Sequence, residues 1–267
     1  MKTLRTVSAI IVVIAMTAVM AIGTFAAGYD WDILNADFTS ANDLKKFAVE
    51  AEAYKNFVTV KDGALHITKD ASVGTGNGAN DIMAVFYLEN AVTSGKLVYS
   101  ARIRTKVTSS LFIGFFDSAN KLKINCVVGS SAQGGVIGIK SSGNNKISDN
   151  AFNDGEWHDV EIVFDIANDK LIFTVDDETK TQTITENFQS SGDTFSDIKR
   201  ITLNLRGGNP ADDTSYIDAD YIRISSGAEA ENNKPGTPDT SDATVIAATV
   251  LAAGAVVTAF AVKKHRK

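Results

Sequence analysis

Hydrophobic and polar residues alternate through most of the middle of the chain. Short alternating runs separated by Gly, Asn and Asp are typical of half-buried β-strands. The pattern predicts strands over residues 57–60, 64–68, 82–88, 97–106, 111–117, 122–128, 135–140, 158–166, 170–176, 180–186, 199–206 and 216–224. Residues 42–47 indicate one short helix. We therefore expect an all-β domain of two antiparallel sheets packed face to face.

Two short features give local predictions. Asp62-Gly63 separates the runs 57–60 and 64–68, and this pair favours a two-residue hairpin turn with positive φ at both residues. Cys126 lies on the apolar side of its alternating run, so we expect a buried thiol. It is the only cysteine, so no intramolecular disulfide can form.

Residues 1–27 have the three parts of a secretory signal. A lysine and an arginine form the basic start, residues 9–22 are mostly apolar and uncharged, and small residues then lead to an expected cleavage after Ala26 or Ala27. The alternative is an uncleaved membrane anchor, but the apolar core is short for a span of roughly 20 residues. We therefore expect residues 28–226 to be an exported domain.

A second apolar segment, residues 243–262, lies near the C-terminus. It is 20 residues long and uncharged, which suffices for a transmembrane helix across a hydrocarbon core of about 30 Å. The basic tail 263–267 follows at once, and basic residues beside a span stay in the cytoplasm. Residues 28–226 are therefore predicted to lie outside the cell, joined to the membrane by a flexible linker, residues 227–242.

The end of this linker resembles the cell-wall sorting signal of Gram-positive surface proteins. In that family a Leu-Pro-x-Thr-Gly motif precedes an apolar helix and a basic tail, and a sortase cleaves after the Thr and joins it to peptidoglycan. Pro238 and Thr240 match this motif, whereas Thr237 replaces its Leu and Ser241 replaces its Gly. The resemblance implies sortase and peptidoglycan as partners, and the alternative is a plain single-pass anchor. Both give an extracellular protein held at the membrane or the wall.

The exported part is strongly acidic. Its 20 Lys and Arg residues stand against all 32 Asp and Glu residues of the chain, which gives a formal charge of −12. Binding to nucleic acid needs a basic surface that releases counterions, so this composition excludes nucleic acid as a partner.

Several short sequence motifs in residues 28–226 resemble those of the concanavalin-A-like lectin and glucanase superfamily. They are the opening segment 36–38 with VKDGAL (60–65), the laminin-G-like GEWHDVEI (155–162) with LIFTVDD (171–177), and the closing YIDADYIRI (216–224). The resemblance implies a two-sheet antiparallel jelly-roll sandwich that binds glycans on its concave sheet. It also implies that Trp157 packs on the core, with stacking on a ligand as the alternative.

The sequence carries no recognisable catalytic motif. Laminarinase-type members of the superfamily use a Glu-x-Asp-x-x-Glu cluster on one strand, and the chain has no Glu-x-Asp. Glu161 and Asp165 share one face of a predicted strand, and we interpret them as solvent-facing charges. The three histidines, His66, His158 and His265, have no zinc-type spacing. We therefore do not expect an enzyme.

Polar side chains on the alternating runs mark a candidate glycan-binding patch. The residues are Arg102, Arg104, Asn125, Asn204 and Arg206. If their strands are neighbours, these residues form one patch. Such a patch suits a glycan, because planar polar groups fix the hydroxyls of a sugar. The alternative is an ordinary solvated sheet face.

Three acidic residues near the two ends of the domain are candidate ligands of a structural calcium ion, which binds six to eight oxygens. They are Asp37, Asp218 and Asp220. The alternative is that they are strand-edge acids that discourage the addition of further strands.

The predicted location at the cell surface and the resemblance to concanavalin-A-like proteins together predict a non-catalytic carbohydrate-binding or adhesion module, with a polysaccharide or glycan as its partner. The first alternative is a glycoside hydrolase or lyase of the same fold. The second is a structural surface protein that binds another protein.

Overall fold

The computed structural model describes residues 29–70, 72–73, 80–107, 110–128, 135–139, 145–185, 194–206 and 215–228. The chain divides into two units, and every described residue belongs to the first, which ends at Ala228. The predicted signal segment, sorting-like motif, transmembrane helix and basic tail all lie outside the described residues. Among the helices of the described part, none is both long and apolar enough to span a membrane.

The described residues form two antiparallel β-sheets, which confirms the predicted all-β class. In chain order the elements are β1 (Leu34–Ala36), α2 (Ala41–Leu44), η1 (Glu52–Phe57), β2 (Val58–Lys61), β3 (Ala64–Thr68), β4 (Ile82–Val92), β5 (Lys96–Lys106), β6 (Leu111–Phe116), β7 (Leu122–Val128), β8 (Ile137–Ile139), β9 (Asn145–Lys146), β10 (Trp157–Asp165), η4 (Ile166–Asn168), β11 (Lys170–Val175), β12 (Glu178–Thr183), β13 (Ile198–Leu205) and β14 (Tyr216–Ser225).

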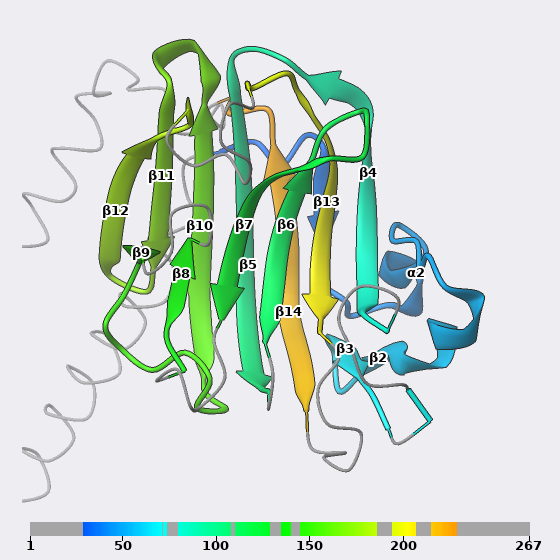
Figure 1. Ribbon diagram of the computed structural model, residues 1–267. Coiled ribbons are helices and arrows are strands. Elements are labelled where there is room, and N and C mark those ends of the chain that lie inside the picture. Colours follow the sequence, from blue (N-terminus) through cyan, green and yellow to red (C-terminus); the bar gives the residue numbers. More distant parts are fainter. Residues whose placement is uncertain are drawn as a thin grey trace, which may run out of the picture. The chain divides into compact units, whose positions relative to one another are not determined.

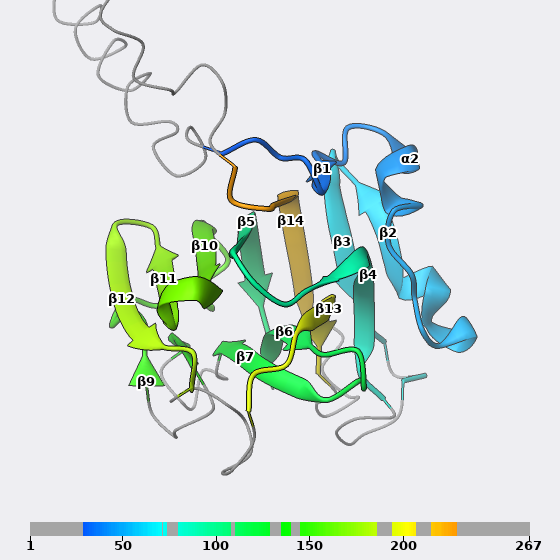
Figure 2. The same ribbon diagram turned by 90° about the horizontal axis from the view of Figure 1, so that it is seen from above.

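The two sheets differ in size. The large sheet has eight strands in the order β12-β11-β10-β5-β14-β3-β2, with β1 also paired to β14. The small sheet has six strands in the order β4-β13-β6-β7-β8-β9. Figure 1 looks onto the small sheet with the large sheet behind it, and Figure 2 shows the two as separate layers.

The core lies between the two sheets and is built by strand alternation. On β5 of the large sheet, Tyr99, Ala101 and Ile103 are buried and belong to the core cluster. On the small sheet, Leu203 of β13 and Cys126 of β7 belong to the same cluster, which confirms the prediction of a buried cysteine. Side chains at the intervening positions therefore point to the outer face of each sheet.

The β2–β3 hairpin confirms the predicted turn. Asp62 and Gly63 have φ values of 53° and 78°. Both lie in the left-handed region that a two-residue hairpin turn of this kind requires.

The two ends of the described domain meet. The backbone N–H of Asp30 donates to the carbonyl of Ala228 at 2.9 Å. A few residues further in, Leu34 of β1 lies opposite Ile224 of β14. The first and last strands therefore close the domain together.

Candidate functional site

The five residues predicted to form one polar patch lie on opposite sides of the sandwich. Arg102 and Arg104 are on β5, where they alternate with core residues on the outer face of the large sheet. Asn125 is on β7 and Asn204 on β13, both in the small sheet, and Arg206 directly follows β13. The prediction of a single patch is therefore wrong. Alternation shows which way a side chain points along its strand, but not which sheet contains the strand.

The outward-facing positions of β4, β13, β6 and β7 line up in rows across the small sheet. Tyr87 lies opposite Arg200, which lies opposite Phe116. The next rows place Thr202 beside Gly114 and Asn125, and Asn204 beside Phe112. We call these positions, together with Arg206, the small-sheet face. Much of this face is covered, because Thr202 is 2% exposed and Asn125 is 3% exposed.

Two arginines of the small-sheet face lie on phenylalanine rings. The Arg200 guanidinium carbon is 3.9 Å from the ring centroid of Phe116, and that of Arg206 is 4.4 Å from the ring centroid of Phe112. Cation–π attraction and the planar shape of the guanidinium favour this arrangement. Each ring therefore holds a planar set of hydrogen-bond donors in a fixed orientation.

An exposed tyrosine stands at one end of the face. Tyr87 is 50% exposed, and its hydroxyl donates to Glu50 Oε1 at 2.9 Å. The same oxygen accepts from Arg200 Nη1 at 2.5 Å, so Glu50 fixes both side chains. Partial burial and the neighbouring Glu50 carboxylate raise the pKa of Tyr87 above its ordinary value. Tyr87 therefore stays neutral and presents a rigid aromatic surface to solvent.

Within the part of the chain that the structure describes, four buried polar atoms of the small-sheet face have no hydrogen-bond partner. They are the Oδ1 acceptors of Asn125 and Asn204 and the Nε donors of Arg200 and Arg206. Buried polar groups are nearly always paired, and each unpaired one costs about 1–3 kcal/mol. All four atoms are covered by neighbouring groups, so a ligand reaches the same side chains only through their exposed parts. Asn204 and Arg206 are the more open part of the face, since the Arg206 side chain is 25% exposed.

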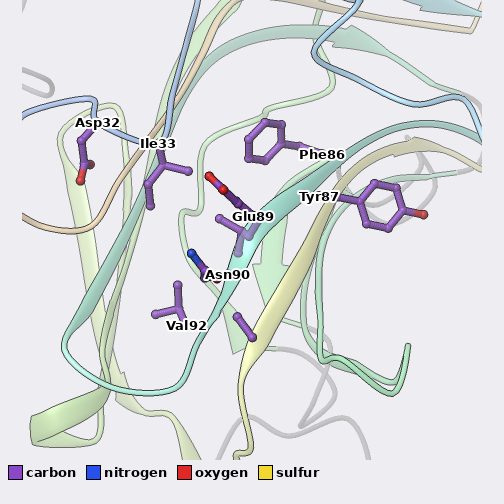
Figure 3. Close-up of a pocket in the computed structure, with 9 residues that line it drawn as sticks. Asp32, Ile33, Phe86, Tyr87, Glu89, Asn90 and Val92 are labelled. Carbon is purple, nitrogen blue, oxygen red and sulfur yellow. The ribbon is translucent and has the colours of Figure 1, made fainter.

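A pocket of about 390 Å³ lies beside β4 and is lined by Asp32, Ile33 and the residues from Phe86 to Val92. Figure 3 shows that the Tyr87 ring, which also lines the pocket, points away from Asp32, Ile33 and Glu89. The Asp32 carboxylate is already satisfied by the backbone and hydroxyl of Ser226 at 2.8 and 2.6 Å. Sequence reasoning missed this pocket because its two segments are far apart in the chain.

The polar cluster on the outer face of the large sheet is closed. Asp218 accepts from Arg104 Nε at 3.1 Å and Nη2 at 2.6 Å, and its other oxygen lies 2.6 Å from His66 Nδ1. Arg104 also lies 4.8 Å from the ring centroid of Trp157, which is half-buried on this outer face and not part of the core. The hydrogen bond to Asp218 raises the pKa of Arg104 above its ordinary value, and burial only partly offsets this rise. These contacts stabilise the sheet and leave little for a ligand.

The structure does not bring the three predicted calcium ligands together. Asp218 is engaged by Arg104 and His66, as above. A β-bulge between Ala219 and Tyr221 makes Asp220 an extra residue, which breaks the alternation that had placed it beside Asp218. Asp37 accepts from the Thr39 hydroxyl at 2.9 Å. Within the described ranges, no group of three or more His, Cys, Asp or Glu side chains is placed to hold a metal ion.

Glu161 on β10 differs from the solvent-facing charge that the sequence predicts. It is half-buried on the outer face of the large sheet, its Oε2 has no partner, and burial raises its pKa to about 7. Two residues earlier on the same face, Asp159 accepts from the hydroxyl of Tyr221 at 3.1 Å. Burial and the Asp159 charge raise the pKa of Tyr221 to about 12. Alternation revealed the shared face but not the burial.

His158 is held between two carboxylates near one end of β10. Its Nδ1 lies 2.8 Å from Asp176 Oδ2 and its Nε2 lies 3.1 Å from Asp154 Oδ1. The ring also stacks on Phe152, with centroids 4.7 Å apart. Burial lowers the pKa of His158, but the two carboxylates outweigh it and raise that pKa above its ordinary value. Both ring nitrogens are used, so this histidine has a structural role.

No family model and no curated protein matches the chain. Similar solved structures include a sialidase, with a TM-score of 0.51 at 15% identity over 72% of this chain. The match spans only 18% of the sialidase chain. Lectin II from Ulex europaeus has a TM-score of 0.47 at 13% identity, over 72% of this chain and 97% of the lectin. A non-specific endo-beta-1,3(4)-glucanase has a TM-score of 0.45 at 12% identity, over 72% and 89%. The sialidase likeness shows a shared sandwich fold.

Proposed function

We propose that this chain is an exported, surface-anchored protein whose concanavalin-A-like jelly-roll domain binds carbohydrate through the small-sheet face. The observation that carries the proposal is the exposed ring of Tyr87 on the same face as two guanidiniums, those of Arg200 and Arg206, that lie on phenylalanine rings. The export signal, the apolar C-terminal segment and the sorting-like motif support display outside the cell. Sortase and peptidoglycan are the proposed anchoring partners.

The chemistry of the face suits sugar hydroxyls. A hydroxyl both donates and accepts, so it can hydrogen-bond to the exposed parts of the Asn204 amide and the Arg206 guanidinium. The apolar face of a sugar ring packs on an exposed aromatic side chain, and Tyr87 presents one. On the outer face of the large sheet, Asp218 is paired with Arg104 and His66.

We propose binding without catalysis because the acids of this face are all engaged. Glu50 is held by Arg200 and Tyr87, and Asp81 accepts from Asn204 Nδ2 at 3.1 Å. Burial raises the pKa of Asp117, but the hydrogen bonds from the Lys121 backbone N–H and from Lys123 outweigh it, so that this pKa lies below its ordinary value. A glycosidase needs one carboxyl with a raised pKa as its general acid.

A polysaccharide pull-down and a glycan array with the purified full-length chain test the proposal. A detergent without a sugar headgroup avoids competition for the site. Asn204→Ala and Arg206→Ala should each weaken binding at least about tenfold, whereas Thr181→Ala, an exposed change on β12 of the other sheet, should leave it unchanged. Binding that is lost in Arg102→Ala but retained in Arg206→Ala would move the ligand to the large sheet and refute the proposed site. A blank array would refute the function.

The second candidate is a glycosidase that uses Glu161 and Asp159. A carboxyl with a pKa of about 7 beside a hydrogen-bonded carboxylate has the pattern of an acid paired with a nucleophile or base. Release of reducing sugar from a polysaccharide that binds, abolished by Glu161→Gln, would support this candidate. Binding without any release leaves the non-catalytic module as the function.

A further inference from the structure

The cations of the small-sheet face are each matched by a carboxylate. Arg200 Nη1 lies 2.5 Å from Glu50 Oε1, and Arg206 Nε lies 3.8 Å from Asp81 Oδ2. In each pair one side chain is 8% exposed, whereas its partner is more open, at 34% for Glu50 and 25% for Arg206, so solvent screens these pairs only in part. Neither guanidinium is free to neutralise a charge on a ligand.

The same balance extends along β7 and β9. Lys123 Nζ lies 3.1 Å from Asp117 Oδ2, in a pair whose side chains are 3% and 6% exposed. Lys146 of β9 pairs with Asp149 at 3.3 Å. Near the β6–β7 turn, the Asp197 carboxylate accepts from the backbone and hydroxyl of Ser118, and none of the described cations is paired with it. Lys199 of β13 donates to the backbone carbonyl of Glu89 at 2.8 Å.

The polar and aromatic groups of the face also follow one strand for some distance. From Arg200 to Arg206 the chain advances six residues, which is about 20 Å at the rise of an extended strand. This length exceeds a single sugar, so only a longer oligosaccharide could contact the groups at both ends of the face.

We infer that the small-sheet face selects a neutral oligosaccharide over an anionic one, an inference that rests on the proposed function. A carboxylated or sulfated sugar would lose water from its charge beside Glu50, Asp81 or Asp117, whose cations are already paired, so nothing on the face would compensate that loss. Uncharged hydroxyls can hydrogen-bond to the exposed parts of Asn204 and Arg206 without needing a free cation.

Matched polymers test this selection with the full-length chain. Polygalacturonate and alginate are compared with their carboxyl-reduced forms, together with neutral β-glucans and galactans of increasing length. The reduced or neutral forms should bind at least about tenfold more tightly than the acidic ones, with little effect of salt. Affinity should rise from the disaccharide to longer oligosaccharides and then level off. Tighter, salt-sensitive binding of the acidic forms overturns the inference but leaves the proposed function standing. Failure of every polymer to bind overturns both.

A charge variant sharpens the test. Glu50→Gln keeps the shape of the side chain but leaves the Arg200 guanidinium uncompensated, so acidic polymers should gain affinity by about tenfold or more. Glu52→Gln makes the same change of charge nearby, in an exposed pair with Lys55 where Glu52 is 84% exposed, and should change nothing. Circular dichroism confirms that both variants are folded. An equal response of the two variants would show a general charge effect and overturn the assignment to this face.

Discussion

Replacement of Gly114 by alanine tests whether the small-sheet face is as closely packed as the structure shows. A Cβ at this position would lie 2.9 Å from Phe116 Cε2, 2.9 Å from Thr202 Oγ1 and 3.3 Å from Leu122 Cδ1. Both nearer neighbours are constrained, because Arg200 lies on the Phe116 ring and Thr202 is 2% exposed. The added methyl group must therefore displace Phe116 or Thr202.

The sign of the effect is informative. Gly114 has no positive φ, so without a clash alanine would stabilise the strand by about 0.4–1 kcal/mol through the unfolded state. Overpacking costs about 1–3 kcal/mol. We expect overpacking to prevail, with a net loss of about 1–2 kcal/mol in the free energy of unfolding and weaker glycan binding as Phe116 and Arg200 shift.

Urea denaturation of Gly114→Ala and wild type measures this change through the midpoint at an unchanged m-value. The double variant Gly114→Ala with Thr202→Ala removes one of the two close contacts, so its loss should be smaller than the sum of the single losses. A more stable Gly114→Ala protein with unaltered binding would refute the close packing of the face.

For three further substitutions, the structure predicts the direction in which the stability of the domain changes. Glu161 has a folded pKa raised to about 7, so stability should fall as pH rises from its ordinary pKa through 7, and Glu161→Gln should remove that fall in urea titrations at several pH values. His158 has a raised folded pKa, so its two carboxylates stabilise the fold fully below its unfolded pKa and less as pH rises through the folded one. His158→Gln should therefore lose more stability at pH 5 than at pH 8, and an equal loss would contradict the assigned ion pairs. Arg104→Ala leaves the carboxylate of Asp218 with one partner fewer and should destabilise the domain by about 1–3 kcal/mol in thermal melts, without loss of glycan binding if the ligand lies on the other sheet.

The strands of this domain can be predicted because their side chains obey a period of two. The run 97–106 became β5 (Lys96–Lys106), and Asp62-Gly63 identified the β2–β3 turn through backbone chemistry that is local. β1 (Leu34–Ala36) and the two-residue β9 (Asn145–Lys146) are too short to show a period, and both are held by their partner strands.

The site was less predictable because it depends on contacts between distant strands. Asn125 and Asn204 were recognised as outward-facing, but only the strand order places them on one sheet and Arg102 on the other. The alternation of polar and apolar residues also predicts that every outward-facing side chain is exposed to solvent, whereas Thr202 is nearly inaccessible. Tyr87 was not selected, since its importance comes from its contact with Glu50 on a segment that precedes the β2–β3 hairpin.

The closure of the domain by its first and last strands has a mechanical consequence. Tension between a glycan and an anchored C-terminus would enter the domain at the Ser225 end of β14. There β14 is paired with β5 on one side and with β1 on the other, and β3 takes over from β1 further along. Pulling this end of β14 out of the sheet therefore requires the ladders on both of its sides to break.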